Sequence, residues 1–345
     1  MSNPLADMDK PDTIFAIGTN MTECHPVAAT GLKKALTKGA KLVVADPRKT
    51  RLAKLAHLHL PIRVGSDVAL LLAMAHVIVR DDLTDEKFIA ERCSDYDEFQ
   101  KHLKEFTPEW ASEICEVPAA DIETAGKLYG SAKLGAIYYT LGITEHICGV
   151  DNVQSLCNLA LLTGNLGKEG TGINPMRGQN NIQGAGDCGA VPANYPGFQP
   201  VASAESHEKF KAAYQQPDMD LGNPMTKVTA LNLCGAKQNG IHAMIINGEN
   251  TVVTDPDKNH CEKALKSLDH LVVVDIFLTE TAQMADIVLP ASAWGETDGV
   301  QANTERRVQR LRKAVPSYGD SKPDWWIIAG IAKELGIPGF EFESA

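Results

Sequence analysis

The sequence predicts an α/β fold with two lobes, each built on a mostly parallel sheet. Continuous apolar runs alternate with helical stretches, as is typical of buried parallel strands joined by crossover helices. The order strand, Gly-x-Asn, helix, strand, Asp occurs twice, first from residue 13 and again from residue 240. The chain has 345 residues, of which 44% are hydrophobic, and this suits about two domains with full cores. We therefore expect two Rossmann-like lobes.

The first half of the chain supplies the first lobe. The region 81–130 is rich in helix signals, and the prolines after Thr107 and Val117 suit the first turn of a helix. The other elements follow from apolar runs and helical periodicity. They are strands at 13–20, 41–46, 57–64 and 134–141, and helices at 26–38 and 68–79.

The same pattern returns after a polar connector at 204–222. Here the predicted elements are strands at 240–247, 270–275 and 285–290, with a helix at 256–267. The expected domains are a first dinucleotide-binding lobe at 1–179, a second at 180–291, and a C-terminal tail at 292–345 that packs on the lobes.

The segment 163–197 differs in amino-acid composition from the rest of both lobes. It holds nine glycines and three prolines, so it is not regular structure throughout. It lacks the high charge and the repetition of disordered segments, and long loops in compact domains usually serve a function. We expect an ordered loop with few strands, packed closely against a ligand.

Charge and hydropathy exclude several classes of function. The net charge of -11 argues against nonspecific nucleic-acid binding, and an anionic ligand would need local donors. No apolar run approaches the roughly 20 residues of a membrane span. The N-terminus lacks a basic region followed by an apolar block, so we expect a cytoplasmic chain, with a periplasmic location left open.

No metal site is predicted from the residues themselves. The eight cysteines form no C-x-x-C pair, and we expect them to be reduced and mostly buried. Four histidines also lack partners at metal-ligand spacing, and the last three are expected in the core or on the surface: His25, His57, His59 and His146.

Candidate ligand-binding residues stand at the predicted strand ends. In open α/β sheets, ligands bind beyond the carboxyl ends of the strands. Glycine there lets the backbone approach a diphosphate, and an aspartate suits a ribose diol or a guanine edge. Alternatively, Asp46 only caps the turn before Pro47. The absent G-x-G-x-x-G pattern disfavours a plain NAD site. The candidates are Gly18, Asn20, Asp46, Arg48, Ser66 and Asp67 in the first lobe, and Gly248, Glu249, Asn250 and Asp275 in the second.

Arg177 is the sharpest candidate. It is the only full positive charge in the sequence between Lys168 and Lys209, and it lies within the glycine- and asparagine-rich loop. An arginine there could bind a carboxylate through two parallel hydrogen bonds. The alternative is an arginine that satisfies carbonyl groups of its own loop.

Two adjacent motifs resemble a known family. Residues 159–175 (LALLTGNLGKEGTGINP), followed by 177–184 (RGQNNIQG), resemble the signature of formate dehydrogenase catalytic subunits, which are molybdopterin oxidoreductases. The resemblance spans essentially the whole chain, and the RGQNN stretch is highly specific within the superfamily. Further stretches follow in the family's order, at 18–26, 45–48, 274–277, 285–292 and 294–299.

The resemblance implies a bis-molybdopterin guanine dinucleotide carrying molybdenum or tungsten. The lobes would be domains II and III of the family, each cradling one dinucleotide. Arg177 matches the arginine that orients formate. The implied reaction, in anaerobic metabolism, oxidises formate to CO2 and releases two electrons, which electron-transfer subunits or domains receive. The residues implied to line the dinucleotide sites are Asn20, Glu23, Asp46, Arg48, Ser66, Asp67, Gly142, Thr144, Gln179, Gly248, Glu249 and Asp275.

The resemblance also implies parts that this stretch of sequence does not contain. We expect the iron–sulfur motif with its 4Fe-4S cluster, and the selenocysteine- or cysteine-histidine pair at the metal, before residue 1. A further domain is expected after residue 345. The chain would then be a central fragment that is inactive by itself. Alternatives are another molybdopterin oxidoreductase, such as a nitrate reductase, and a non-catalytic subunit like the large subunit of complex I. Arg177 favours formate.

Overall fold

The structure is a computed structural model that describes residues 1–220 and 224–344. It divides into two compact units. The first unit comprises Met1–Gln183 and Ala302–Arg307. The second comprises Gly184–Gln301 and Val308–Ala345, as far as these are described. The predicted boundary between the lobes was 179/180, and the observed division between the units is at 183/184.

The first unit is built on a five-stranded sheet. The strand order is β3-β2-β1-β4-β5, and all four neighbouring pairs are parallel. The order reverses between β1 and β4, which makes this pair the topological switch point of the sheet. The strands are β1 (Thr13–Ile17), β2 (Lys41–Ala45), β3 (Leu58–Leu60), β4 (Gly135–Tyr139) and β5 (Gly172–Pro175).

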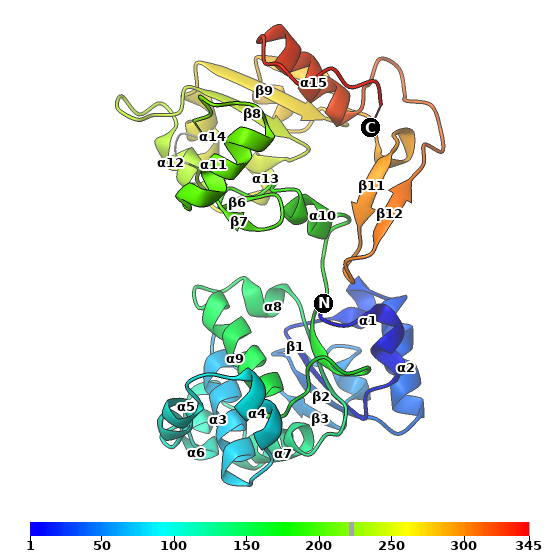
Figure 1. Cartoon of the computed structure of the whole chain (residues 1–345), viewed down its shortest axis with the longest axis vertical. Coiled ribbons are helices and arrows are strands. Elements are labelled where there is room, and N and C mark those ends of the chain that lie inside the picture. The colour runs from blue at the N-terminus through cyan, green and yellow to red at the C-terminus, as the bar shows by residue number, and fades with distance from the viewer. Residues whose placement is uncertain (221–223, 345) are drawn as a thin grey trace. The chain divides into compact units, whose positions relative to one another are not determined.

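Both faces of this sheet are covered. Side chains alternate between the faces along a strand, so Phe15 and Ile17 enter one apolar core while Ile14 and Ala16 enter the other. Figure 1 shows α3, α7 and α9 gathered on the first face and α2 on the second. The longer helices are α2 (Ala28–Thr37), α3 (Asp67–Arg80), α4 (Glu86–Arg92), α5 (Tyr96–Leu103), α6 (Pro108–Cys115), α7 (Ala119–Gly130) and α9 (Gly149–Leu162), with short turns at η1 (Leu5–Asp9), α1 (Met21–Cys24), η2 (Ala53–Leu55) and α8 (Leu141–Thr144).

The helix starts predicted from proline are confirmed. Thr107 is the N-cap of α6, its hydroxyl accepts the Trp110 amide at 3.3 Å, and Pro108 occupies the first turn. A hydroxyl acceptor at this position satisfies an amide that has no partner within the helix. Helix α7 begins directly after Pro118.

The second unit is built on a smaller parallel sheet of order β10-β9-β8. Helix α14 packs on one face of the sheet and α15 lies on the other (Figure 1). Ile327 and Ile331 of α15 pack in one apolar cluster with Val274 of β9. No helix in the described residues combines the length and apolar character needed to cross a membrane. The elements from α10 onward are α10 (Ile182–Asp187), β6 (Asn194–Tyr195), β7 (Gln199–Pro200), α11 (Ala204–Ala213), α12 (Lys227–Leu233), β8 (Ala243–Asn247), α13 (Thr251–Thr254), α14 (Lys258–Lys266), β9 (His270–Asp275), η3 (Ala282–Met284), β10 (Ile287–Pro290), η4 (Trp294–Glu296), β11 (Gly299–Ala302), β12 (Val308–Leu311) and α15 (Asp324–Glu334).

The structure differs from the sequence predictions in three places. The segment 163–197 is mostly irregular, but it contributes β5 to the main sheet. The polar connector 204–222 contains the ten-residue helix α11, while its residues 221 and 222 lie outside the described residues. Of the eight cysteines, all free, only Cys115 and Cys261 are buried, so the expectation that most are buried was wrong.

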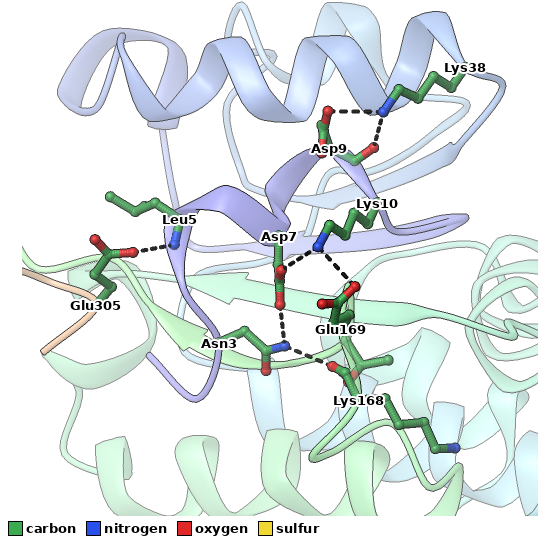
Figure 2. Close-up of polar contacts among 10 residues, drawn as sticks. Asn3, Leu5, Asp7, Asp9, Lys10, Lys38, Lys168, Glu169 and Glu305 are labelled. Atoms are coloured by element: carbon green, nitrogen blue, oxygen red, sulfur yellow. Dashed lines mark hydrogen bonds and ion pairs between the residues drawn. The ribbon is translucent and has the colours of Figure 1, made fainter. Parts of the chain in front are cut away.

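A polar network joins the N-terminal segment to the loop before β5 (Figure 2). The Asn3 amide nitrogen donates to Asp7 Oδ2 at 3.0 Å and to the Lys168 carbonyl at 2.8 Å. Lys10 Nζ lies 3.0 Å from Asp7 Oδ1 and 2.9 Å from Glu169 Oε2. Asp7 is therefore a buried carboxylate with partners on both oxygens. Burial opposes its charge, but the bonds from Asn3 and Lys10 outweigh that effect and lower the pKa of Asp7.

We expect Asp7→Asn to destabilise the first unit at pH 7 by about 1.5–3 kcal/mol, the usual range for hydrogen bonds to a charged group. Because the folded pKa lies below the unfolded one, the contribution of Asp7 is present above about pH 4 and lost as the pH falls through the folded pKa. Urea unfolding at several pH values measures the difference. Asp9→Asn, at the exposed contact with Lys38, is the control and should have a smaller effect. An Asp7 effect that does not diminish as the pH falls below about 4 would contradict this account.

Candidate functional site

A cleft of about 500 Å³ opens at the carboxyl ends of the strands in the first unit. Each of the five strands sends its following loop to the lining of this cleft, as the topology requires of an open parallel sheet. The lining includes seven of the residues predicted from the sequence: Gly18, Asn20, Asp46, Arg48, Asp67, Gly142 and Gln179.

Two glycines allow the loops to meet at the switch point between β1 and β4. The Gly142 amide donates to the Gly18 carbonyl at 3.2 Å, and the Thr140 hydroxyl donates to the same oxygen at 2.7 Å. A Cβ on Gly18 would lie 2.6 Å from the Gly142 carbonyl carbon, and one on Gly142 would lie 2.7 Å from the Gly18 Cα. Gly18 also has a φ of +55°, a conformation that L side chains rarely adopt. Neither position accommodates a side chain without movement of the backbone.

Asp46 makes the turn contact that the sequence left open, and it also lines the cleft. Its Oδ1 accepts the Arg48 amide at 2.8 Å, which braces the turn at Pro47. The same residue is buried and lines the cleft beside Arg48. The turn-capping contact is therefore present, and the side chain still lies where a ligand can meet it.

Asp67 and His146 form a second polar pair at the cleft. His146 Nε2 lies 4.0 Å from Asp67 Oδ2 and 2.9 Å from the Gly142 carbonyl. Burial raises the pKa of the Asp67 carboxyl, and His146 partly opposes that shift. His146, expected in the core or on the surface, is half-buried and lines the cleft. His57 Nδ1 accepts the Leu42 amide and His59 Nε2 contacts the Asp46 carbonyl, so both have structural contacts.

Three predicted residues lie beside the cleft and not in its lining. Glu23 Oε2 accepts the Asn20 amide nitrogen at 2.9 Å, and the Ser66 hydroxyl donates to the Arg63 carbonyl at 2.6 Å. Thr144 ends α8, next to the lining residue His146. Sequence reasoning missed several lining residues that carry polar groups, among them Thr19, His25 and Thr140.

Arg177 follows β5 and lines an adjoining cavity of about 220 Å³, which shares Gly178 and Gln179 with the larger cleft. Its side chain is exposed, and Nη2 donates to Gln183 Oε1 at 3.1 Å. Arg177 therefore lies in the loop that lines both cavities, directly before the two residues that they share.

In the second unit, Gly248 and Glu249 follow β8. Gly248 has a φ of +67°, as Gly18 has a positive φ at the matching place in the first unit. Glu249 is paired with Lys227, whose Nζ also lies 2.5 Å from Asp255 Oδ1. Burial opposes the charge of Lys227, but contacts with the two carboxylates outweigh it and raise the pKa of the lysine.

The other two candidates of the second unit have local contacts. Asn250 Oδ1 accepts the amide of Thr281 at 3.2 Å and its hydroxyl at 2.9 Å, which ties the loop after β8 to the loop after β9. Asp275 Oδ1 accepts the Phe277 amide at 3.2 Å, as Asp46 accepts the amide two residues after it. The two units thus repeat one turn geometry at their strand ends.

Comparison with known proteins gives the family. A family model described as molybdopterin oxidoreductase matches residues 1–334. The chain belongs to the molybdopterin oxidoreductase family. This molybdopterin oxidoreductase chain is 45% identical to F420-dependent formate dehydrogenase 2 subunit alpha of Methanococcus maripaludis, covering 100% of the chain and 50% of that protein. It is 40% identical to formate dehydrogenase H of Escherichia coli, over 98% of the chain and 47% of that protein.

These matches confirm the resemblance to formate dehydrogenase alpha subunits. The chain spans about half the length of the curated relatives it matches. Among solved structures, acetylene hydratase from Pelobacter acetylenicus matches with a TM-score of 0.79 over 99% of the chain and 51% of that structure, at 22% identity. That likeness confirms the α/β fold with parallel sheets.

The cleft of the first unit fits the pterin cofactor that the family implies. Two polar atoms on its lining residues, Thr19 Oγ1 and His25 Nδ1, are buried without a hydrogen-bond partner among the described residues. Buried polar groups nearly always have partners, so a ligand with polar atoms would satisfy these two. Gly18 and Gly142 also bring backbone groups to the lining of the cleft, which suits a diphosphate-containing group.

Proposed function

We propose that this chain supplies the cofactor-binding lobes of a formate dehydrogenase that oxidises formate to CO2. The observation that carries the proposal is 40–47% identity to formate dehydrogenase alpha subunits over nearly the whole chain. The Arg177 loop beside the cleft supports it, because a guanidinium matches the geometry of a carboxylate.

The bis-molybdopterin guanine dinucleotide, with molybdenum or tungsten, would be held by both units. In the first unit, the polar lining of the cleft would bind one dinucleotide. Glu23, Ser66 and Thr144, beside the cleft, would hold the loops that carry this lining. In the second unit, Gly248, Glu249 and Asp275 stand at the matching strand ends. The carboxylates suit the donor groups of a guanine or ribose, and Arg48 suits a phosphate.

Arg177 would bind the substrate carboxylate. Its charge attracts formate into a chain whose net charge is negative, and its planar fork fixes the direction of the C–H bond. When bound, the metal–pterin group would take up the two electrons released as formate becomes CO2 and a proton. Electron-transfer subunits or domains would carry those electrons onward.

The proposal is tested on the purified holoenzyme that contains this chain. We expect molybdenum or tungsten together with pterin, and formate-dependent reduction of a viologen dye. The 345-residue chain alone should give no such reduction. Metal and pterin without formate oxidation would indicate another molybdopterin oxidoreductase. A preparation without metal and pterin would favour a non-catalytic subunit like that of complex I. Dye reduction by the chain alone would refute the expectation that activity also needs the metal-ligating pair and the 4Fe-4S cluster.

A further inference from the structure

The backbone of Arg177 is held on both sides by side chains from distant parts of the chain. Its amide donates to Thr304 Oγ1 at 3.1 Å, and its carbonyl accepts from His25 Nε2 at 2.7 Å. Thr304 lies 127 positions after Arg177, and His25 lies 152 positions before it. Both contacts fix the peptide groups of a residue whose side chain is exposed.

Thr304 is itself fixed in orientation. Its hydroxyl donates to the Pro175 carbonyl at 3.1 Å while it accepts the Arg177 amide, so its one hydrogen and a lone pair are both used. The turn that carries it is braced by Asn303, whose Oδ1 accepts the amides of Glu305 at 3.1 Å and Arg307 at 3.0 Å. Valine at 304 would keep the shape and remove both hydrogen bonds.

His25 is held by the end of α1, where its amide donates to the Met21 carbonyl at 2.9 Å. A carbonyl oxygen only accepts, so the contact with Arg177 requires the hydrogen on Nε2. His25 also lines the cleft of the first unit. A single imidazole therefore joins the wall of the cleft to the Arg177 loop.

We infer that His25 and Thr304 are positioning residues that clamp the Arg177 backbone, so that the guanidinium is presented to a carboxylate in one orientation. The inference rests on the proposed function, in which Arg177 binds formate. Gln183 completes the arrangement by accepting from Nη2 of the guanidinium. Rates fall steeply when a substrate-binding group is displaced, so residues that hold such a group affect turnover without touching the substrate.

The kinetic test uses matched pairs of variants in the holoenzyme. Thr304→Val and His25→Ala should each lower kcat for formate by about tenfold, while KM changes by less than about threefold because the charge of Arg177 remains. Thr304→Ser retains a hydroxyl, so it should stay within about twofold of the parent. Thr37→Val, at the exposed end of α2, is the control and should leave kcat unchanged.

Two further measurements separate a clamp from a general structural role. In an Arg177→Lys background, Thr304→Val should have little additional effect, because the clamp acts through Arg177. Hydrogen exchange of the Arg177 amide should quicken in Thr304→Val and stay slow in Thr304→Ser, with metal and pterin content unchanged. A full tenfold loss in the lysine background, or loss of pterin, would overturn the inference.

The exchange measurement also distinguishes the two proposals. If the holoenzyme does not oxidise formate but Thr304→Val still frees the Arg177 amide, the proposed function fails and the clamp stands. If formate is oxidised and the amide exchanges equally in all variants, the proposed function stands and the clamp fails.

Discussion

Replacing Arg177 by lysine in the holoenzyme is expected to lower kcat/KM for formate by about two to three orders of magnitude. Lysine keeps the charge but loses the planar fork, so the orientation of the carboxylate suffers more than its attraction. Each hydrogen bond to a charged group contributes about 1.5–3 kcal/mol. A loss of roughly 3–4 kcal/mol in transition-state binding lowers kcat/KM by about two to three orders of magnitude. Metal and pterin content should stay near the parent value, because other residues line the cleft.

Arg92→Lys is the matched control for this substitution. Arg92 lies exposed at the end of α4, away from both cavities, and the change should leave formate kinetics unaltered. If Arg177→Lys keeps kcat/KM within a few-fold, the arginine only braces its loop through Gln183, the alternative that the sequence left open. If metal and pterin are lost together, Arg177 serves cofactor retention and the substrate assignment is wrong.

The sheet of the first unit was largely predictable because its central strands are buried on both faces. All five residues of β1 and of β4 are buried, so each strand is a continuous apolar run with a clear end. Strand β5 was not predicted, since it is the four-residue edge strand Gly-Ile-Asn-Pro with no apolar run. Its place depends on pairing with β4 and not on local preference.

The candidate site was predictable only where it depends on topology. Parallel strands bring their carboxyl ends to one edge, so Asn20, Asp46 and Asp67 could be expected to meet although they are far apart in sequence. Gly142 and Gln179 came from the family resemblance. The contacts of Thr304 and His146 could not be predicted from the sequence. Thr304 stands in a turn with no local signal, and its role comes from a bond to a residue 127 positions away. His146 becomes the partner of Asp67 only because the fold brings the start of α3 close to it.

The close approach at the switch point makes Gly18→Ala the substitution with the largest expected effect on folding. Alanine would carry the strain of a positive φ, roughly 1–2 kcal/mol, and would place Cβ 2.6 Å from the backbone of Gly142. Overpacking of this kind costs about 1–3 kcal/mol, so the first unit should lose roughly 2–5 kcal/mol in total. Urea unfolding, followed through hydrogen exchange of the β1 amides, measures the loss in this unit, and the holoenzyme variant should also retain less pterin.

Gly39→Ala separates the two causes. Gly39 has a φ of +98°, yet a Cβ there would meet no described atom within 4 Å, so this variant carries the backbone strain without the collision. It should lose only about 1–2 kcal/mol and keep its pterin. Equal losses at the two positions would mean that the loops after β1 and β4 can separate freely. In that case the close approach of Gly18 to Gly142 would not limit the side chain at position 18, and a larger residue there would be compatible with a bound dinucleotide.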